Sequence, residues 1–146
     1  GGTVKLTILN SNFDKASPTL IDTVQQIIDP TKDGHGLGVA PIGHIVTVDT
    51  AEEVTVNITS NITFDDGYSF SILKPQIEQV VSDYLLELRK DWANQNNLIV
   101  RITQIETKIL GIEGVIDIGG TKINDSASNL ILSTYQIPIM GGVNSW

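Results

Sequence analysis

The most regular alternation of apolar and polar side chains in the chain is found in the stretch Val54-Thr-Val-Asn-Ile-Thr-Ser-Asn-Ile-Thr-Phe64. The apolar positions of one face are Val54, Val56, Ile58, Ile62 and Phe64. The other face carries only threonine and asparagine, at positions 55, 57, 59, 61 and 63. Successive side chains of a strand point to opposite faces, so the pattern predicts a long strand with one buried face. The polar face bears no charge, so it could lie against another sheet or chain without leaving a charge unpaired.

Downstream of this strand the spacing predicts a long amphipathic helix that starts between Ser71 and Pro75. Its apolar stripe, which we expect to pack on the apolar face of 54–64, is Ile77, Val80, Val81, Tyr84, Leu85, Leu88 and Trp92. Four further elements are expected, namely a short strand at 98–102, a helix from Thr103 to about Ile112, a strand at 115–118 and a closing strand at 129–137. Thr103 and Glu106 have the spacing of a capping box, and Gly119-Gly120 suits a bulge.

Upstream, the pattern predicts a strand at 3–9, a helix from Ser17-Pro18 to Asp29, and a strand at 45–48. Serine caps a helix, and proline fits its first position because its missing N–H would be unpaired there. Residues 31–43 are a glycine-rich connector, and a turn is expected at 49–53. Two strands and one helix are too little for an independent core, so this part must pack on the rest of the chain, on another chain, or on sequence outside it.

The predicted fold class is α+β with two small subdomains. Residues 1–50 form a β-α-β subdomain that upstream sequence is expected to complete. Residues 51–146 form a β-α-(β)-α-β-β subdomain with a mixed sheet.

Composition and charge exclude several classes of function. The chain has 146 residues, 40% of them hydrophobic and 18% charged, which is typical of a globular protein. A net charge of −8 without clustered lysine and arginine argues against nucleic acid. No apolar run is long enough to span a membrane, and no secretory leader is visible. The absence of cysteine excludes disulfides, thiolate zinc sites and a cysteine nucleophile.

Residues with the potential for chemistry are sparse. Asp29, Asp33 and His35 could form a weak metal site, but a glycine-rich loop is a poor frame for ligands. The glycines of 34–38 lack the Lys-Ser/Thr of a phosphate-binding loop. Asp65-Asp66 before a glycine is ordinary turn chemistry. We therefore expect no catalytic residue, no metal, no cofactor and no small-molecule substrate.

The last ten residues, 137–146, are apolar and uncharged. Such a segment either folds back into the core or serves as an interaction segment. The candidate partner-contact residues are Ile137, Ile139, Met140, Val143 and Trp146.

The order of three motifs resembles the C-terminal part of the baseplate J-like family of contractile tailed phages, prophages and phage-tail-like bacteriocins. The motifs are Ala-Pro-Ile-Gly at 40–43, the block from Gln104-Ile-Glu to Gly111-Ile-Glu-Gly-Val-Ile-Asp117, and Asn129-Leu followed by Ile137-Pro-Ile-Met-Gly141. The resemblance covers nearly the whole chain from about Val4.

The resemblance implies a structural wedge component of a tail baseplate, not an enzyme. Its implied partners are other copies of itself and neighbouring wedge proteins, with assembly in the bacterial cytoplasm and a final place in the virion tail baseplate. A small-ligand-binding regulatory α+β domain is the alternative, because β-α-β-β arrangements often serve that purpose. A ligand domain should show a pocket with convergent polar groups, and an assembly module should show flat contact surfaces.

Overall fold

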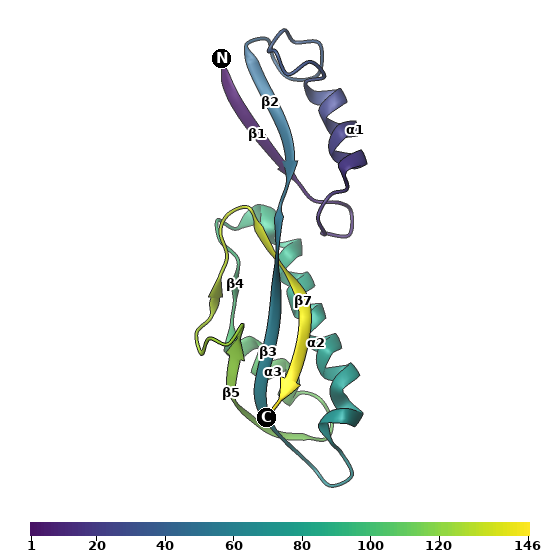
Figure 1. The fold of residues 1–146 in the computed structure, drawn as a ribbon, viewed down its shortest axis with the longest axis vertical. Coiled ribbons are helices and arrows are strands. Elements are labelled where there is room, and N and C mark those ends of the chain that lie inside the picture. Colours follow the sequence, from purple (N-terminus) through teal and green to yellow (C-terminus); the bar gives the residue numbers. More distant parts are fainter. The chain divides into compact units, whose positions relative to one another are not determined.

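The computed structural model describes all residues from Gly1 to Trp146 and divides into two compact units (Figure 1). Unit 1 is Gly1–Glu52 and unit 2 is Glu53–Trp146. Helices and strands are mixed without regular alternation, so the predicted α+β class is confirmed.

Unit 1 pairs β1 (Gly2–Ile8) with β2 (His44–Thr50) in a parallel two-stranded sheet, connected through α1 (Pro18–Ile28). The predicted start of α1 is confirmed, because the Ser17 hydroxyl accepts from the Leu20 N–H at 3.2 Å and Pro18 opens the helix. The helix ends before Pro30, as expected because a residue that precedes a proline avoids the helical region of backbone conformation.

The turn predicted at 49–53 is wrong. Strand β2 continues to Thr50, and β3 (Glu52–Phe64) begins after a single intervening residue. The Thr50 hydroxyl donates to the Ile8 carbonyl at 2.7 Å and accepts from the Ala16 N–H at 2.9 Å. These tertiary bonds hold the backbone extended at residues whose polarity alone favours a turn.

Unit 2 has a three-stranded sheet, a small two-stranded sheet and two α-helices (Figure 1). Its elements after β3 are α2 (Phe70–Lys90), the short helix η1 (Trp92–Asn94), β4 (Ile99–Val100), α3 (Ile102–Leu110), β5 (Val115–Ile123), β6 (Leu130–Ile131) and β7 (Gln136–Ser145).

The main sheet of unit 2 has the order β5-β3-β7, so the alternating stretch of the sequence is its central strand. Strand β5 is antiparallel to β3, and the register slips between Thr59 and Asn61. The extra residue opposite this slip comes from the Gly119–Gly120 region, where Gly120 has a φ of +62°, which confirms the predicted bulge. Strand β7 runs in the same direction as β3, so the sheet is mixed (Figure 1).

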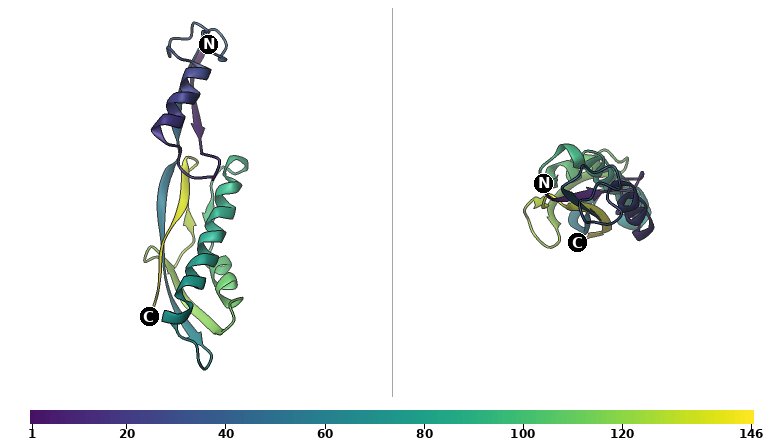
Figure 2. Two further views of the ribbon diagram at one scale, coloured as in Figure 1. Left: turned by 90° about the vertical axis from the view of Figure 1, so that its right-hand side faces the viewer. Right: turned by 90° about the horizontal axis from the view of Figure 1, so that it is seen from above.

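Helices α2 and α3 lie on one face of this sheet (Figure 2). The predicted packing is confirmed for most of these residues, because Ile77, Val81, Tyr84 and Leu85 of α2 are buried in one cluster with residues of the apolar face of β3. Trp92 lies beyond α2 in η1, and neither it nor Val54 belongs to this cluster. Its members at the centre, Ile58, Ile77 and Leu85, have no exposed surface. Threonine and asparagine on the other face of β3 point away from both helices.

The starts of both helices in unit 2 differ from the prediction. Helix α2 begins at Phe70 with Ser69 as its cap, so Pro75 lies inside it. The capping box at Thr103 and Glu106 is wrong, because α3 begins one residue earlier and has no side-chain cap from Arg101. The Ile102 N–H donates instead to Asn129 Oδ1 at 3.0 Å, from a loop 27 positions away.

The closing strand predicted at 129–137 is also wrong. Only Leu130 and Ile131 pair, with β4, and the chain then turns before β7 starts at Gln136. Pro138 lies inside β7, which is possible because β7 is an edge strand and a proline there leaves no central ladder bond unmade.

Candidate assembly surface

The C-terminal stretch is folded into unit 2 as strand β7. The Trp146 N–H donates to the Ser60 carbonyl at 3.2 Å, beside the centre of β3. Near the other end of the strand, Arg89 Nη1 of α2 donates to the Pro138 carbonyl at 2.8 Å. These bonds attach β7 to the neighbouring strand β3 and to helix α2, which packs on the face of the sheet.

The five residues expected to contact a partner divide into two groups. Ile137 and Val143 are buried within this chain, at 0% and 1% exposure. Ile139 and Met140 are half-buried, and Met140 packs against the core cluster. Trp146 is 63% exposed. The first pair therefore supports the strand from inside, and the remaining three leave apolar surface available.

Trp146 lies beside a cation. Lys122 Nζ of β5 is 4.9 Å from the centroid of its ring, within the range of a cation–π interaction. Gly120 is also near, since a Cβ built there would lie 3.9 Å from Trp146 Nε1. The indole is thus positioned on the sheet by its neighbours although most of its surface faces solvent.

Strand β7 leaves an unprotected edge. It is ten residues long and contains no charged side chain. Proteins usually protect such edges with lysines, prolines, bulges or covering segments, because the free N–H and C=O groups can pair with another strand. Here Pro138 is one such device near the start of the strand, and no further strand of unit 2 pairs with this edge.

The outward face of β3 continues this uncharged surface, and the charged Asp117 and Lys122 lie opposite Thr63 and Thr59 on the neighbouring strand β5. No element of unit 2 covers it (Figure 2), and Thr55, Asn57, Asn61 and Thr63 are exposed. A Cβ added at Gly141 of β7 would meet Asn57 Oδ1 and the Thr55 methyl group, so the glycine lets these side chains lie flat against the strand. We call the outward residues of β3 together with the edge of β7 the open surface.

Asn124 bonds to the backbone of β3 at one end of the open surface, a role that the sequence analysis did not predict. Asn124 Oδ1 accepts from the Asn57 N–H at 2.9 Å, and Asn124 Nδ2 donates to the Thr55 carbonyl at 3.0 Å. Both Asn124 and Asp125 have positive φ, as in a tight hairpin turn. Asparagine and aspartate are ordinary turn residues, but nothing in the sequence indicates that the Asn124 side chain also bonds to another strand.

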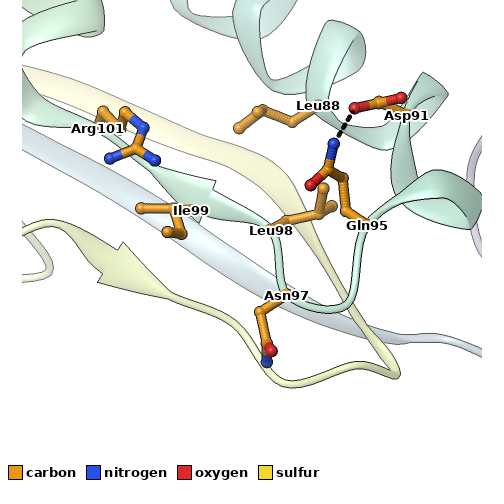
Figure 3. A pocket seen from close by; sticks show the side chains of 7 residues that line it. All are labelled: Leu88, Asp91, Gln95, Asn97, Leu98, Ile99 and Arg101. Carbon is orange, nitrogen blue, oxygen red and sulfur yellow. Dashed lines mark hydrogen bonds between the residues drawn. The ribbon is translucent and has the colours of Figure 1, made fainter.

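A small pocket lies where α2 gives way to β4 (Figure 3). Its volume is about 220 Å³, below the usual range for ligand sites. Asp91 accepts from Gln95 Nε2 at 2.7 Å and from Asn94 Nδ2 at 3.1 Å, and these bonds lower the pKa of its carboxyl. Asn97 Nδ2 donates to the Leu132 carbonyl at 2.7 Å. Asp91, Gln95 and Asn97 around this pocket thus bond to other groups of the protein instead of converging on a ligand.

The residues considered for metal binding serve the backbone of unit 1. Asp29 is buried, and its Oδ2 accepts from the Val46 N–H at 3.0 Å. Asp33 accepts from the backbone N–H of His35 at 2.9 Å, and its other oxygen lies 2.9 Å from His35 Nδ1. The backbone bond from His35, with a smaller contribution from Thr31, lowers the pKa of Asp33 to about 2. No group of three histidine, cysteine or acidic side chains is arranged to hold a metal ion.

The helices give no sign of membrane insertion, since none combines the length and the apolar character that a span requires. In unit 2 the open surface is therefore a more developed feature than the small pocket beside η1.

Comparison with protein families agrees with this description. Residues 56–145 match the baseplate J-like protein C-terminal domain, and residues 1–50 match the baseplate J-like central domain. The chain belongs to the baseplate J-like family, and each of its compact units coincides with one of these matches.

Two proteins of Bacillus subtilis (strain 168) are similar over nearly the whole chain. The phage-like element PBSX protein XkdT is 36% identical over 142 residues, which is 97% of this chain and 39% of that protein. The uncharacterized protein YqbT is 38% identical over 143 residues, 98% of this chain and 39% of that protein. The chain therefore spans about two fifths of the length of these relatives.

Proposed function

We propose that this chain is part of a structural wedge protein in the tail baseplate of a phage or of a prophage-derived particle. It acts through protein–protein assembly and not through catalysis. The observation that carries the proposal is the match of both compact units to the two domains of the baseplate J-like family. The similarity to a protein named for a phage-like element supports the same conclusion.

The proposed partners are other copies of the same protein and neighbouring baseplate wedge proteins. Assembly takes place in the cytoplasm of the bacterial host, and the final location is the tail baseplate of the particle. The open surface suits this role, because the uncharged outward face of β3 and the uncharged edge of β7 can be buried in an interface without the cost of desolvating charges of their own.

Within the open surface we assign the contact to Ile139, Met140 and Trp146. Trp146 is the most exposed of them and is an aromatic residue of the kind that dominates interface energetics. Ile137 and Val143 contribute indirectly, by fixing β7 on the core from its buried side.

Size-exclusion chromatography with light scattering tests the proposal, on the protein alone and mixed with the protein encoded next to it. We expect a complex larger than either component. Trp146→Glu should weaken that complex by about tenfold or more, as loss of an interface hot spot does. The matched control is Ile72→Glu on α2, where the replaced side chain is 60% exposed against 63% for Trp146.

If no larger species forms under any mixing condition, the assembly role is wrong. If a complex forms and both variants bind equally well, the role stands but the assignment of the open surface is wrong. Thermal melts of both variants separate loss of binding from loss of folding.

A further inference from the structure

The β1–β2 sheet of unit 1 has one apolar face that α1 covers only in part. Val4 and Leu6 of β1 lie opposite Val46 and Val48 of β2 in the register, on the same face. Helix α1 packs against β2, where Val46 and Val48 are each 6% exposed. On β1, by contrast, Val4 is 43% exposed.

The outer edge of β2 is closed by two side chains of the helix and its C-cap. Gln25 Nε2 donates to the Val46 carbonyl at 2.9 Å, and its Oε1 accepts from the Val48 N–H at 2.8 Å. Asp29 Oδ2 accepts from the Val46 N–H at 3.0 Å. Both side chains are buried, at 4% and 2% exposure. They take the place that a neighbouring strand would occupy, so β2 cannot accept another strand on this side.

The outer edge of β1 has no such closure. No strand lies beside it, because the sheet contains only β1 and β2. Next to it is an apolar groove of about 270 Å³, lined by Val4, Leu6, Ile28, Val39 and Pro41 among others. The rim residue Val39 is 72% exposed. Apolar side chains are thus gathered in a groove that leaves part of their surface exposed to solvent within unit 1.

Two buried polar atoms without hydrogen-bond partners lie in the same pair of strands. Thr7 Oγ1 of β1 and His44 Nδ1 of β2 are buried polar atoms with no hydrogen-bond partner within the chain. Buried polar groups are nearly always bonded, so such atoms require an explanation. Parallel sheets are also almost always covered on both faces and rarely consist of two strands alone. These features indicate that the sheet of unit 1 lacks a further strand beside β1.

We propose that a β-strand from the polypeptide that precedes unit 1 in the longer protein pairs with the outer edge of β1, and that apolar side chains of the same segment fill the groove. The occupant is assigned to the same protein for two reasons. Unit 1 matches a domain described as central, which places family sequence ahead of it. The chain also covers only 39% of its relatives, so a large part of such proteins lies outside the matched region. This inference is independent of the assembly role proposed above.

The experiment compares the longer protein, with the preceding segment present, and the 1–146 chain. Hydrogen exchange of the peptide that contains β1 should be at least about tenfold slower in the longer protein, since strand pairing protects backbone amides. Peptides of β3 in unit 2 serve as the internal reference and should exchange alike in both proteins.

A substitution in the groove gives a second readout. Val39→Lys should lower the melting temperature of the longer protein by several degrees and leave that of the 1–146 chain unchanged. Leu37→Lys is the matched control, because Leu37 is 69% exposed, lies two positions away and does not line the groove. It should be neutral in both proteins.

Three outcomes would overturn the proposal. In the first, β1 exchanges equally fast in both proteins. In the second, Val39→Lys destabilises the 1–146 chain as much as the longer protein, which would mean that the chain itself already covers the groove. In the third, β1 becomes protected only when a separate protein is added, which would assign the edge to a partner.

Discussion

Unit 1 contains four of the 21 buried apolar side chains of the chain, and unit 2 contains the other 17. Two of the four in unit 1 are alanines, whereas unit 2 buries eight isoleucines and four leucines among others. Each unit also buries two polar side chains: in unit 1 Gln25 and Asp29 bond to the backbone of β2, whereas in unit 2 Ser60 and Thr121 bond to each other. The two units are therefore stabilised by different interactions.

Because of this difference, the stability of the two units should respond differently to amino-acid substitutions. Apolar burial is shared among many contacts, so unit 2 loses stability in proportion to the volume removed. Buried hydrogen bonds are few and specific, so unit 1 loses most when a single partner is removed and leaves the other unsatisfied. Substitutions in each unit can test this difference in how the two units are stabilised.

Leu85→Ala should cause the largest loss, about 2–5 kcal/mol of the free energy of unfolding of unit 2, as truncations of buried leucines do. Leu85 is fully buried at the centre of the cluster between α2 and the sheet. Denaturant melts followed by far-UV circular dichroism measure the effect. Leu110→Ala, on a residue 44% exposed, is the control and should change little. A loss below about 0.5 kcal/mol for Leu85→Ala would show that the stripe does not form the core.

Gln25→Met should destabilise unit 1 by about 1–3 kcal/mol, the cost of leaving buried backbone groups without partners. The side chain donates to the Asp29 and Val46 carbonyls and accepts from the Val48 N–H. Methionine keeps the volume and removes all three bonds. Hydrogen exchange of β2 peptides is the measurement, because it reports on unit 1 alone. Gln26→Met, on the exposed neighbour, should have no effect. Equal exchange in the two variants would show that the bonds contribute nothing.

Asn129→Ala should cost about 1 kcal/mol in unit 2, the usual value of a helix N-terminal cap. Asn129 Oδ1 accepts from the Ile102 N–H at the start of α3. Thr103→Ala removes the residue that the sequence pattern assigns to the cap, and it should be close to neutral. The same denaturant melts compare the two. If Thr103→Ala proves the more damaging variant, the cap belongs to the pattern and not to the distant asparagine.

The smallest expected effect is the dependence of the stability of unit 1 on pH. The pKa of Asp33 is about 2 in the folded state, below the ordinary value of 3.8. A lowered folded-state pKa stabilises the folded state above the ordinary value, and the contribution is lost as pH falls from about 4 to about 2. An NMR titration of the Asp33 carboxyl should therefore show a midpoint near 2. A midpoint near 3.8 would mean that the bond from the His35 N–H does not persist in solution.

Much of the fold follows from local pattern. The alternation at 54–64 predicts the central strand, and the spacing from Ile77 to Trp92 predicts the face of α2 that is buried. Ser17-Pro18 predicts the start of α1, and Gly119-Gly120 predicts the bulge. In each case the determining interactions lie within a few residues in sequence, or depend only on which face is apolar.

The failures share a physical cause, which is a bond from a residue far away in sequence. The turn at 49–53 is replaced by extended backbone because Thr50 bonds to Ile8 and Ala16. The Thr103 capping box gives way to Asn129. The closing strand is misplaced because β4 pairs with only two residues, Leu130 and Ile131. No local pattern contains these partners.

The candidate surfaces were predictable to different degrees. The absence of charge on 137–146 and on the polar face of β3 is visible in the sequence. The burial of Ile137 and Val143 is not, because it depends on where β7 joins the sheet. The roles of Gln25 and Asp29 were also hidden, since a glutamine and an aspartate on a helix normally indicate a solvated position.

The placement of the aromatic residues determines what optical spectroscopy can detect in this protein. Both tryptophans and all three tyrosines are in unit 2, and the only aromatic residue of unit 1 is Phe13. Intrinsic fluorescence and near-ultraviolet dichroism therefore report on unit 2 and are silent on the opening of unit 1. A single, clean fluorescence transition on heating would be compatible with a unit 1 that has already unfolded. Because Trp92 is half-buried and Trp146 is 63% exposed, iodide quenching should report mainly on Trp146, and binding of a partner at β7 should reduce that quenching.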